Sequence, residues 1–550
     1  MRLVDHETTR IVVRSLLIRF SCLFRVTELF QDNLQALLIT GVDPVAAGWQ
    51  LREISEKTRG KAPELLEHLI EVRSDLANAD PAIVGTILTI LHTALLEQGW
   101  EVVQNLAVDD IQRLELSIPP RTTNRFLLQQ LYAIHQQDNA LEQLVESLMT
   151  APPDKWVEAA QVLSPLMQRS QWSVEALFPT SLALLQHVSL ASPLLDLANY
   201  SFRQRKLQQH PASEHVEMLR TLLGEVVGRL GRFEDDPRTF GTEVPIVQAR
   251  LAEAVALAVS LSDALALIGD LSSIGKLHQA MELRHRRVQS EAAGALARLG
   301  DDQGKDRLIE LLNEPAARLR VIQYAEELGF GEEIDVKFRS PESTSEAELA
   351  LWLSQPQQMG VPPTNVEVLH SMRCLWPSFN DPIDVFLVRF EYNFGERSYS
   401  NVGITGPVTF AMSSDLSDLS LGDAYAIYAG WHAEHEEIFT LTSENWNDLQ
   451  REQLEQWEKH LERCGLHNID AVLIGRFLDE MAGVFTAKRD DRPVIVITDG
   501  LESIEYVTGS GERAMGPQDI FNLYKGRKML RTFNPDRDFS GDGFESTVDE

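Results

Sequence analysis

The chain has 550 residues, which is too long for one compact hydrophobic core, so we expect two or more domains. Hydrophobic residues make up 44% and charged residues 24% of the sequence, which is ordinary for a folded protein. The formal net charge of -32 argues against general binding to nucleic acid or anionic lipid, because both require a basic surface. The cysteines lie far apart, at Cys22, Cys374 and Cys464, which predicts no disulfide framework or zinc motif and fits a reducing compartment.

The first segment, residues 1–26, is apolar but carries arginines throughout RIVVRSLLIRFSCLF. No uncharged run in it approaches the roughly 18 residues that a membrane-spanning helix needs. A secretory signal would place its charges before the apolar run. The pattern predicts an N-terminal extension or an amphipathic helix that caps the next domain, and an interfacial membrane helix is the alternative.

Residues 27–338 have an almost wholly helical pattern. Apolar residues recur at spacings of three and four in segments such as RFLLQQLYAIHQQ and HVEMLRTLLGEVVGRLG. The breaks between such segments are short and contain Pro, Gly, Asp or Ser. Medium-length helices joined by short turns pack as antiparallel neighbours, which predicts a bundle or a solenoid.

A repeated motif favours the solenoid. Gly269, Gly300 and Gly329 each close a predicted helix, and they are separated by 31 and 29 residues. Glycine suits the left-handed position just after a helix. Asp270 and Asp301 follow two of these glycines, where an acidic side chain can cap the next helix. Because one helix pair cannot bury its apolar face alone, we expect successive pairs to stack into a superhelix.

The segments VQSEAAGALARLGD, LIELLNEP and ARLRVIQYAEELG resemble the HEAT repeat family. That family has a second helix rich in small residues, a Leu-Gly-Asp close and an Asp-Pro or Glu-Pro turn. The resemblance covers about residues 267–329. Before Pro245 the helical periodicity continues without the motif, so those helices are either divergent repeats or an unrelated helical domain. HEAT-like proteins are mostly interaction scaffolds and a few are enzymes, so the resemblance implies a scaffold or adaptor without deciding between the two.

The pattern changes at about Arg339. Residues 339–365 predict a linker with one short helix, AELALWL, between polar and Pro-rich stretches. Residues 366–530 combine strand-like segments such as DVFLVRFEYNF with helical ones, which predicts a separate α+β domain of no recognised family. Residues 531–550 predict an acidic disordered tail. The predicted fold class is therefore mainly α, a HEAT-like α-solenoid followed by a smaller α+β domain.

Arginines near the repeat turns form the predicted partner-binding site. Stacked repeats bring equivalent turns onto one ridge, where these residues would form a basic stripe: Arg284, Arg286, Arg287, Arg318 and Arg320. The hypothesis is that Arg286 and Arg318, at least, remain available to bind an acidic segment of a partner with bidentate geometry. The alternative is that these arginines bond acidic residues of the preceding turns, Asp270 and Asp301.

Two further motifs are candidate metal sites. GWHAEHEE places His432 and His435 one helical turn apart with Glu436 beside them, so that two ligands share a face. An exposed polar helix end is the alternative. The tail carries oxygen ligands at calcium-loop spacing, although the bidentate Glu and the exit helix are missing: Asp538, Ser540, Asp542, Ser546 and Asp549. A solvated acidic tail is the alternative there.

The sequence thus predicts a cytoplasmic protein–protein interaction scaffold without a cofactor, whose partner is another protein with an acidic segment. Nucleic acid and a membrane span are not expected. We find no nucleophile elbow, no Gly-x-Gly-x-x-Gly motif and no cysteine paired with a base, and we assign no catalytic residue. The alternative is an enzyme with its site in the C-terminal domain, lined by His432, Glu436 or Asp499, while the solenoid recruits a protein substrate.

Overall fold

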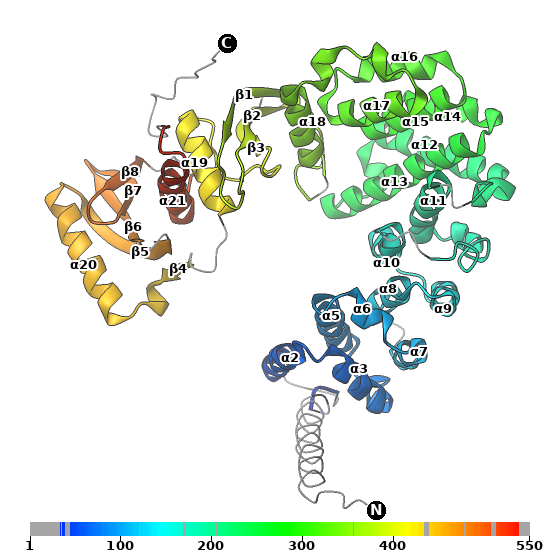
Figure 1. The fold of residues 1–550 in the computed structure, drawn as a ribbon, viewed down its shortest axis with the longest axis horizontal. Coiled ribbons are helices and arrows are strands. Elements are labelled where there is room, and N and C mark those ends of the chain that lie inside the picture. The colour runs from blue at the N-terminus through cyan, green and yellow to red at the C-terminus, as the bar shows by residue number, and fades with distance from the viewer. Residues whose placement is uncertain are drawn as a thin grey trace, which may run out of the picture. The chain divides into compact units, whose positions relative to one another are not determined.

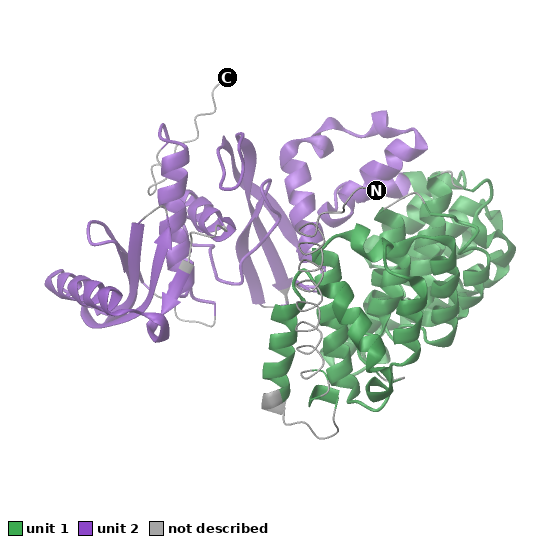
Figure 2. Ribbon diagram, turned by 60° about the horizontal axis from the view of Figure 1, so that its bottom comes forward, with its two compact units in different colours: residues 1–305 green, residues 306–550 purple. Residues whose placement is uncertain are grey.

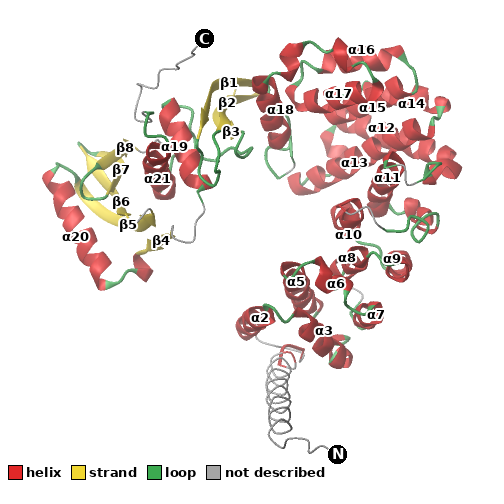
Figure 3. Cartoon of the chain, viewed as in Figure 1, coloured by secondary structure: helices red, strands yellow, loops and turns green. Residues whose placement is uncertain are grey.

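The computed structural model describes residues 34, 36–38, 44–119, 122–168, 172–204, 207–355, 357–395, 397–433, 439–477, 480–507 and 513–537 (Figure 1). The chain divides into two compact units, unit 1 at residues 1–305 and unit 2 at residues 306–550 (Figure 2). Helices make up the described part of unit 1, whereas unit 2 also contains two antiparallel sheets (Figure 3). This confirms the predicted fold class of a helical part followed by an α+β part. The predicted N-terminal segment, residues 1–26, and residues 538–550 lie outside the described residues.

Unit 1 consists of α-helices and short 3-10 helices joined by brief turns. Apolar residues at helical spacing place one side of each helix in the core, as in α3, where Leu65, Leu66 and Leu69 are buried. The elements are α2 (Pro44–Thr58), α3 (Ala62–Glu71), α4 (Arg73–Leu76), α5 (Pro81–Glu97), α6 (Trp100–Gln104), α7 (Val108–Leu116), α8 (Phe126–His135), α9 (Asp138–Thr150), α10 (Trp156–Gln168), η1 (Thr180–Gln186), α11 (Val188–Arg203), η2 (Pro211–His215), α12 (Val216–Asp235), η3 (Pro237–Phe240), α13 (Val244–Ile268), η4 (Leu271–Ser273), α14 (Ile274–Met281) and α15 (Arg286–Arg298).

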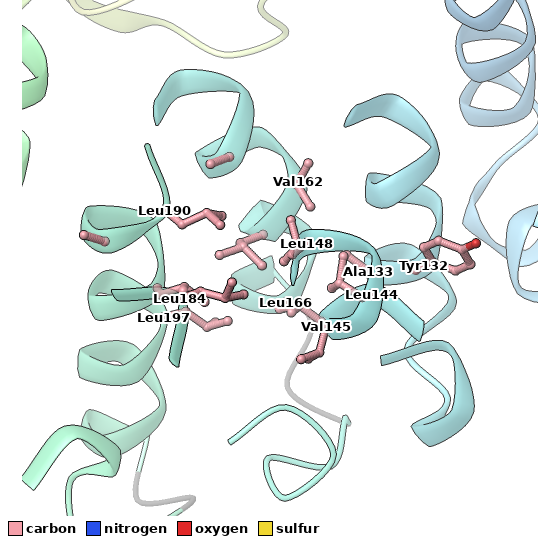
Figure 4. Close-up of a cluster of buried hydrophobic side chains, with 14 of the residues drawn as sticks. Tyr132, Ala133, Leu144, Val145, Leu148, Val162, Leu166, Leu184, Leu190 and Leu197 are labelled. Atoms are coloured by element: carbon pink, nitrogen blue, oxygen red, sulfur yellow. The ribbon is translucent and has the colours of Figure 1, made fainter. Parts of the chain in front are cut away.

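The core of unit 1 runs continuously along the stacked helices. Figure 4 shows one section of it, where Leu148 of α9, Val162 and Leu166 of α10 and Leu190 of α11 lie among one another. Each helix therefore buries its apolar side against more than one neighbour, as expected when a single pair cannot form a core.

The predicted helix ends are confirmed. Gly269, Gly300 and Gly329 have φ angles of 82°, 86° and 81°, the left-handed conformation that glycine adopts without a Cβ penalty. Asp270 then accepts a hydrogen bond from the Ser272 amide, and Asp301 accepts one from the Gln303 amide. The Gly-Asp pairs thus end one helix and cap the next.

Helix α13 is the longest and one of the most apolar helices of the described part of unit 1. It is the one helix among the described residues that is long and apolar enough to cross a membrane, but 67% of its most apolar window is buried inside the unit. Helices α11, α12 and α15 all pack against it. Its apolar composition thus fits a helix that is covered from several sides by its neighbours.

Unit 2 begins with helices rather than with the sheet. Helix α16 (Asp302–Leu311) crosses the division between the units, and α17 (Pro315–Leu328), η5 (Gly331–Glu333), η6 (Val336–Arg339) and α18 (Pro341–Leu353) follow. Helix α18 packs against α17 and against the first sheet. The division at residues 305/306 thus comes earlier in the chain than the boundary expected at 338/339. The short helix expected within residues 339–365 is part of α18.

The first sheet has the order β1-β2-β3, with β1 at Asn365–Cys374, β2 at Ile383–Phe394 and β3 at Arg397–Thr405. Alternate residues of β2 face opposite sides. Phe386, Val388 and Phe390 pack with α18, whereas Val385 and Leu387 pack with α19 (Leu421–His432). The period of two along the strand thus places a helix on each face.

The second sheet is a meander with the order β4-β5-β6-β7-β8. One face packs against Trp457 and Leu461 of α20 (Asp448–Arg463), and the other packs against Phe521 and Tyr524 of α21 (Pro517–Phe533). Helix α21 extends past the predicted start of the tail at residue 531. The strands are β4 (Phe439–Thr442), β5 (His467–Phe477), β6 (Glu480–Arg489), β7 (Arg492–Thr498) and β8 (Ser503–Val507), with η7 (Ser443–Asn445) after β4.

Helices α19 and α21 join the two sheets by a close backbone crossing. A Cβ atom on Gly430 would lie 1.9 Å from the Asn522 carbonyl oxygen, and one on Gly526 would lie 1.7 Å from the Ala426 carbonyl oxygen. The contacts are reciprocal, because DAYAIYAG (423–430) and DIFNLYKG (519–526) align position by position. Each half of the domain is thus a meander followed by an Asp-x4-Tyr-x-Gly helix, which indicates an internal repeat.

Gly526→Ala is expected to destabilise unit 2 by about 3 kcal/mol, because the new methyl group overlaps backbone that cannot move aside. The matched control is Gly275→Ala in α14, where a Cβ atom would meet nothing within 4 Å. That change should leave stability unchanged or raise it by up to about 1 kcal/mol. Urea denaturation of the two variants measures the difference, and equal midpoints would contradict the close crossing.

Candidate functional site

Two of the predicted arginines are exposed in unit 1. Arg284 lies just before α15 and Arg287 lies in its first turn, and no hydrogen bond or ion pair within the described chain engages either guanidinium group. The backbone amide of Arg284 donates to the Glu234 carboxylate at 2.6 Å, which fixes the turn. The half-buried Arg286 donates to the Gln289 side chain at 2.9 Å. Arg284 and Arg287 are therefore the accessible members of this group.

Arg318 is buried in unit 2, so the hypothesis that it remains available to a partner is wrong. Its guanidinium donates to the Leu312 carbonyl at 2.9 Å, to the Ser343 carbonyl at 2.8 Å and to the Glu346 carboxylate at 3.0 Å. These bonds hold α18 against the turn before α17. As the alternative expected, Arg318 pairs with an acidic residue of its own chain, but that residue is Glu346 rather than Asp301.

Arg320 is also engaged within unit 2. It donates to the Gln323 side chain at 2.8 Å and to the Tyr324 hydroxyl at 3.0 Å. Its guanidinium carbon lies 4.2 Å from the centre of the Tyr324 ring. Asp301, one of the predicted partners, instead accepts from His278 at 2.9 Å, and Asp270 lies 3.1 Å from Arg220. The five arginines are thus not equivalent, although they follow equivalent turns in the sequence.

The start of α15 adds a second feature that favours an anion. His285 occupies the N-cap position, and its side chain makes no capping hydrogen bond to the helix. Uncapped amides and the helix dipole give the first turn a partial positive charge. This end of the helix therefore supplies backbone donors beside Arg284 and Arg287.

Acidic side chains of neighbouring helices lie close to Arg287. Asp196 of α11 is exposed and accepts a hydrogen bond from the Ser260 hydroxyl of α13 at 2.6 Å. Loss of hydration among the surrounding helices, with the charges of Asp263 and Glu291, raises its pKa to about 6, although the Ser260 bond and Arg287 oppose the shift. Asp196 is therefore charged above about pH 6 and neutral below, and when charged it offsets part of the positive charge of Arg287.

A polar network holds these groups in place. Arg203 of α11 forms a two-bond ion pair with Asp263 of α13. Asn199 donates to the Ser260 carbonyl at 3.2 Å, and its own carbonyl oxygen lies 2.9 Å from His210 Nε2. Burial, and secondarily Arg203, lowers the pKa of His210 to about 4, so His210 is neutral at physiological pH. These bonds fix α11 to α13 and so fix Asp196 relative to α15.

The sequence could not identify this arrangement. Asp196 and Ser260 are separated by 64 residues, and neither belongs to a motif. The signal that could have identified them is weak, namely charged and hydroxyl residues on the apolar helices α11 and α13. The resulting surface has mixed charge, with two arginines whose guanidinium groups have no partner within the described residues.

His432, a candidate metal and catalytic residue of unit 2, contacts aromatic side chains. Nδ1 of His432 accepts a hydrogen bond from Trp376 Nε1 at 3.3 Å, and its ring stacks on Phe379. His435, Glu436 and the tail residues Asp538, Ser540, Asp542, Ser546 and Asp549 lie outside the described residues. Within the described ranges no group of three His, Cys, Asp or Glu is placed to hold a metal ion.

Asp499 belongs to an ionic network and does not have the properties of a general base. Its carboxylate accepts from the Tyr524 hydroxyl at 2.5 Å and from Lys528 at 3.1 Å. Burial would raise the pKa of Asp499, but these bonds and the amides of Leu501 and Glu502 outweigh burial and lower the pKa far below its usual value. A carboxylate this acidic is a poor proton acceptor at neutral pH.

Comparison of the chain with family models, with curated proteins and with solved structures finds no match.

Arg318→Met should destabilise unit 2 by about 3 kcal/mol, because it leaves Glu346 and two carbonyl groups without their donor. Arg287→Met should change stability by less than about 0.5 kcal/mol, since its guanidinium is exposed and unpaired. Urea denaturation followed by tryptophan fluorescence compares the two. Similar midpoints would show that the distinction between structural and accessible arginines is wrong.

Proposed function

We propose that the protein is a cytoplasmic interaction scaffold whose unit 1, a HEAT-like solenoid, binds an acidic segment of a partner protein. The observation that carries the proposal is the pair of exposed, unpaired guanidinium groups of Arg284 and Arg287 at the uncapped start of α15. In a chain of net charge -32, such a pair is a local exception to the overall charge. The two described cysteines, Cys374 and Cys464, are free thiols, which supports a reducing compartment.

Arginine suits this role better than lysine would. Each guanidinium group can form two parallel bonds to one carboxylate, and the backbone amides of the first turn of α15 can donate hydrogen bonds to a further carboxylate oxygen. Charge-assisted bonds of this kind contribute about 1.5–3 kcal/mol each when they exclude water. Two arginines three residues apart would therefore select a segment with closely spaced acidic residues over one with a single charge.

Asp196 makes the binding surface selective. Its carboxylate repels an acidic segment and attracts any basic residue beside it, so a segment with one basic residue among acidic ones would satisfy both Arg287 and Asp196. This repulsion weakens the binding of segments that place an acidic residue, rather than a basic one, opposite Asp196. The ion pair between Arg203 and Asp263 keeps Asp196 from moving away.

Reversing both arginines in the double variant Arg284→Glu and Arg287→Glu should weaken binding of an acidic peptide at least about tenfold, since two charge-assisted contacts become repulsive. The probe is a fluorescein-labelled peptide of alternating Glu and Ser, and fluorescence polarisation of the full chain measures its affinity. Asp196→Asn should strengthen binding a few-fold at pH 7.5, because it removes a repelling charge without removing a helix contact.

The matched control is Arg73→Glu, an exposed charge reversal on α4. It should leave the affinity near that of the unmodified chain. If Arg73→Glu weakens binding as much as the double variant does, the affinity depends only on the net charge of the chain and not on a site at α15. If the thermal midpoint of the double variant falls by many degrees, Arg284 and Arg287 stabilise the fold and the proposal is wrong.

A further inference from the structure

Unit 2 carries an aromatic cluster that the proposed function does not use. Trp352 lies in the last turn of α18. Its ring centre is 5.5 Å from that of Phe410, and the planes of the two rings form an angle of 68°. Phe410 in turn stacks on Trp431 of α19, with ring centres 3.9 Å apart and an angle of 4° between the planes. All three side chains are half-buried. The rings thus contact one another, Trp352 edge to face with Phe410 and Phe410 face to face with Trp431, and solvent reaches part of each ring.

The backbone holds these rings in fixed positions. Phe410 exchanges two backbone hydrogen bonds with Ile404 of β3, at 2.8 and 3.0 Å. Trp431 follows Gly430 directly, at the crossing of α19 with α21. Trp352 lies on α18, whose Leu349 and Leu353 are buried against the first sheet. A surface that is ordered in this way loses little conformational entropy when a ligand binds.

A carboxylate without a partner lies on the same side of α18 as Trp352. Glu348 precedes Trp352 by four residues, so the two side chains lie one above the other on the helix. Glu348 is half-buried, and burial raises its pKa. Within the described residues no hydrogen bond or ion pair engages its carboxylate, whereas Glu346 on the same helix is paired with Arg318. Glu348 is thus partly dehydrated without compensation from this chain.

We propose that Trp352, Phe410 and Trp431 together with Glu348 form a binding site for a cationic side chain, arginine or lysine, of a partner protein. Aromatic faces attract a cation through their quadrupole, and the carboxylate supplies the counter-charge. An apolar side chain would contact the same rings but would leave Glu348 unpaired, and an acidic one would be repelled. The charge that this site selects is therefore opposite to the one selected at Arg284 and Arg287, and the proposal does not depend on that site.

The test uses the full chain labelled with 5-fluorotryptophan and observed by ¹⁹F NMR. Trp352→Phe and Trp431→Phe assign the two resonances. The probes are the N-acetyl methylamides of arginine and of citrulline, which has nearly the same shape without the charge. We expect both resonances to shift saturably with the arginine compound and to shift little with citrulline. Glu348→Gln should weaken the arginine compound about threefold to tenfold, in the range of one exposed cation–π or charge-assisted contact.

The matched control is Glu342→Gln, an exposed carboxylate in the first turn of the same helix. It should leave the titration unchanged. Equal responses to arginine and citrulline would overturn the proposal, because the site would then bind without regard to charge. Equal affinities in the Glu348→Gln and Glu342→Gln variants would also overturn it. The Gln variants keep the size of the side chain, and an unchanged ¹⁹F spectrum before titration shows that each variant is folded.

Discussion

Helix α13 must be covered on several sides, and the arrangement of unit 1 depends on this constraint. Its apolar residues occupy most of its circumference, and Ala258, Leu261 and Leu265 are fully buried. Helices α11, α12 and α15 supply the cover. Because α11 and α15 pack on the same helix, Asp196 of one comes close to Arg287 of the other. The charged surface is thus a consequence of the way in which an apolar helix is buried.

The charged groups on this surface are tolerated either because they are paired or because they remain exposed to solvent. A buried charge is tolerated when it is paired, and Arg203 with Asp263 satisfies that rule. Asp196 is exposed and accepts one hydrogen bond, from Ser260, while the surrounding helices raise its pKa. Arg284 and Arg287 avoid the cost of burial by staying in solvent. Groups that are accessible and incompletely paired are the ones that a partner can bind with a net gain.

The packing of unit 2 depends on the close contact between the backbones of α19 and α21 at Gly430 and Gly526. Two helices that cross this closely act as one rigid element between the two sheets. Each sheet then covers its own side of the helix pair, which explains why similar helix sequences follow two meanders of different size. The same crossing fixes Trp431, so the aromatic cluster depends on it as well.

Local signals in the sequence were sufficient for the helix ends and for the fold class. A glycine followed by an aspartate ends one helix and caps the next through contacts within a few residues, so its effect can be predicted without the tertiary structure. The division at residues 305/306, earlier than the expected 338/339, depends instead on contacts between residues far apart in the chain. Polar residues around the start of α18 suggested a linker, but they belong to a packed helix. The Ser343 carbonyl and the Glu346 carboxylate of this helix accept hydrogen bonds from Arg318, which lies some 25 residues earlier in the chain.

The site required long-range information. Arg287 and Arg318 follow similar turns, and only the tertiary structure shows that one is exposed and the other buried. Asp196 and Ser260 carry no motif, and their proximity results from the packing of α11 on α13. Glu348 resembles any helical glutamate in the sequence. Its lack of a partner becomes visible only when the neighbours of α18 are known.

Hydrogen exchange of the full chain, with and without a saturating acidic peptide, tests the central claim most directly. We expect the amides of residues 284–289 to exchange more slowly when the peptide is bound, because the loop before α15 and the first turn of α15 would bind its carboxylates. Exchange in α17 and α18 should change little. Protection spread evenly over the chain, or protection around Arg318 with none at α15, would contradict it.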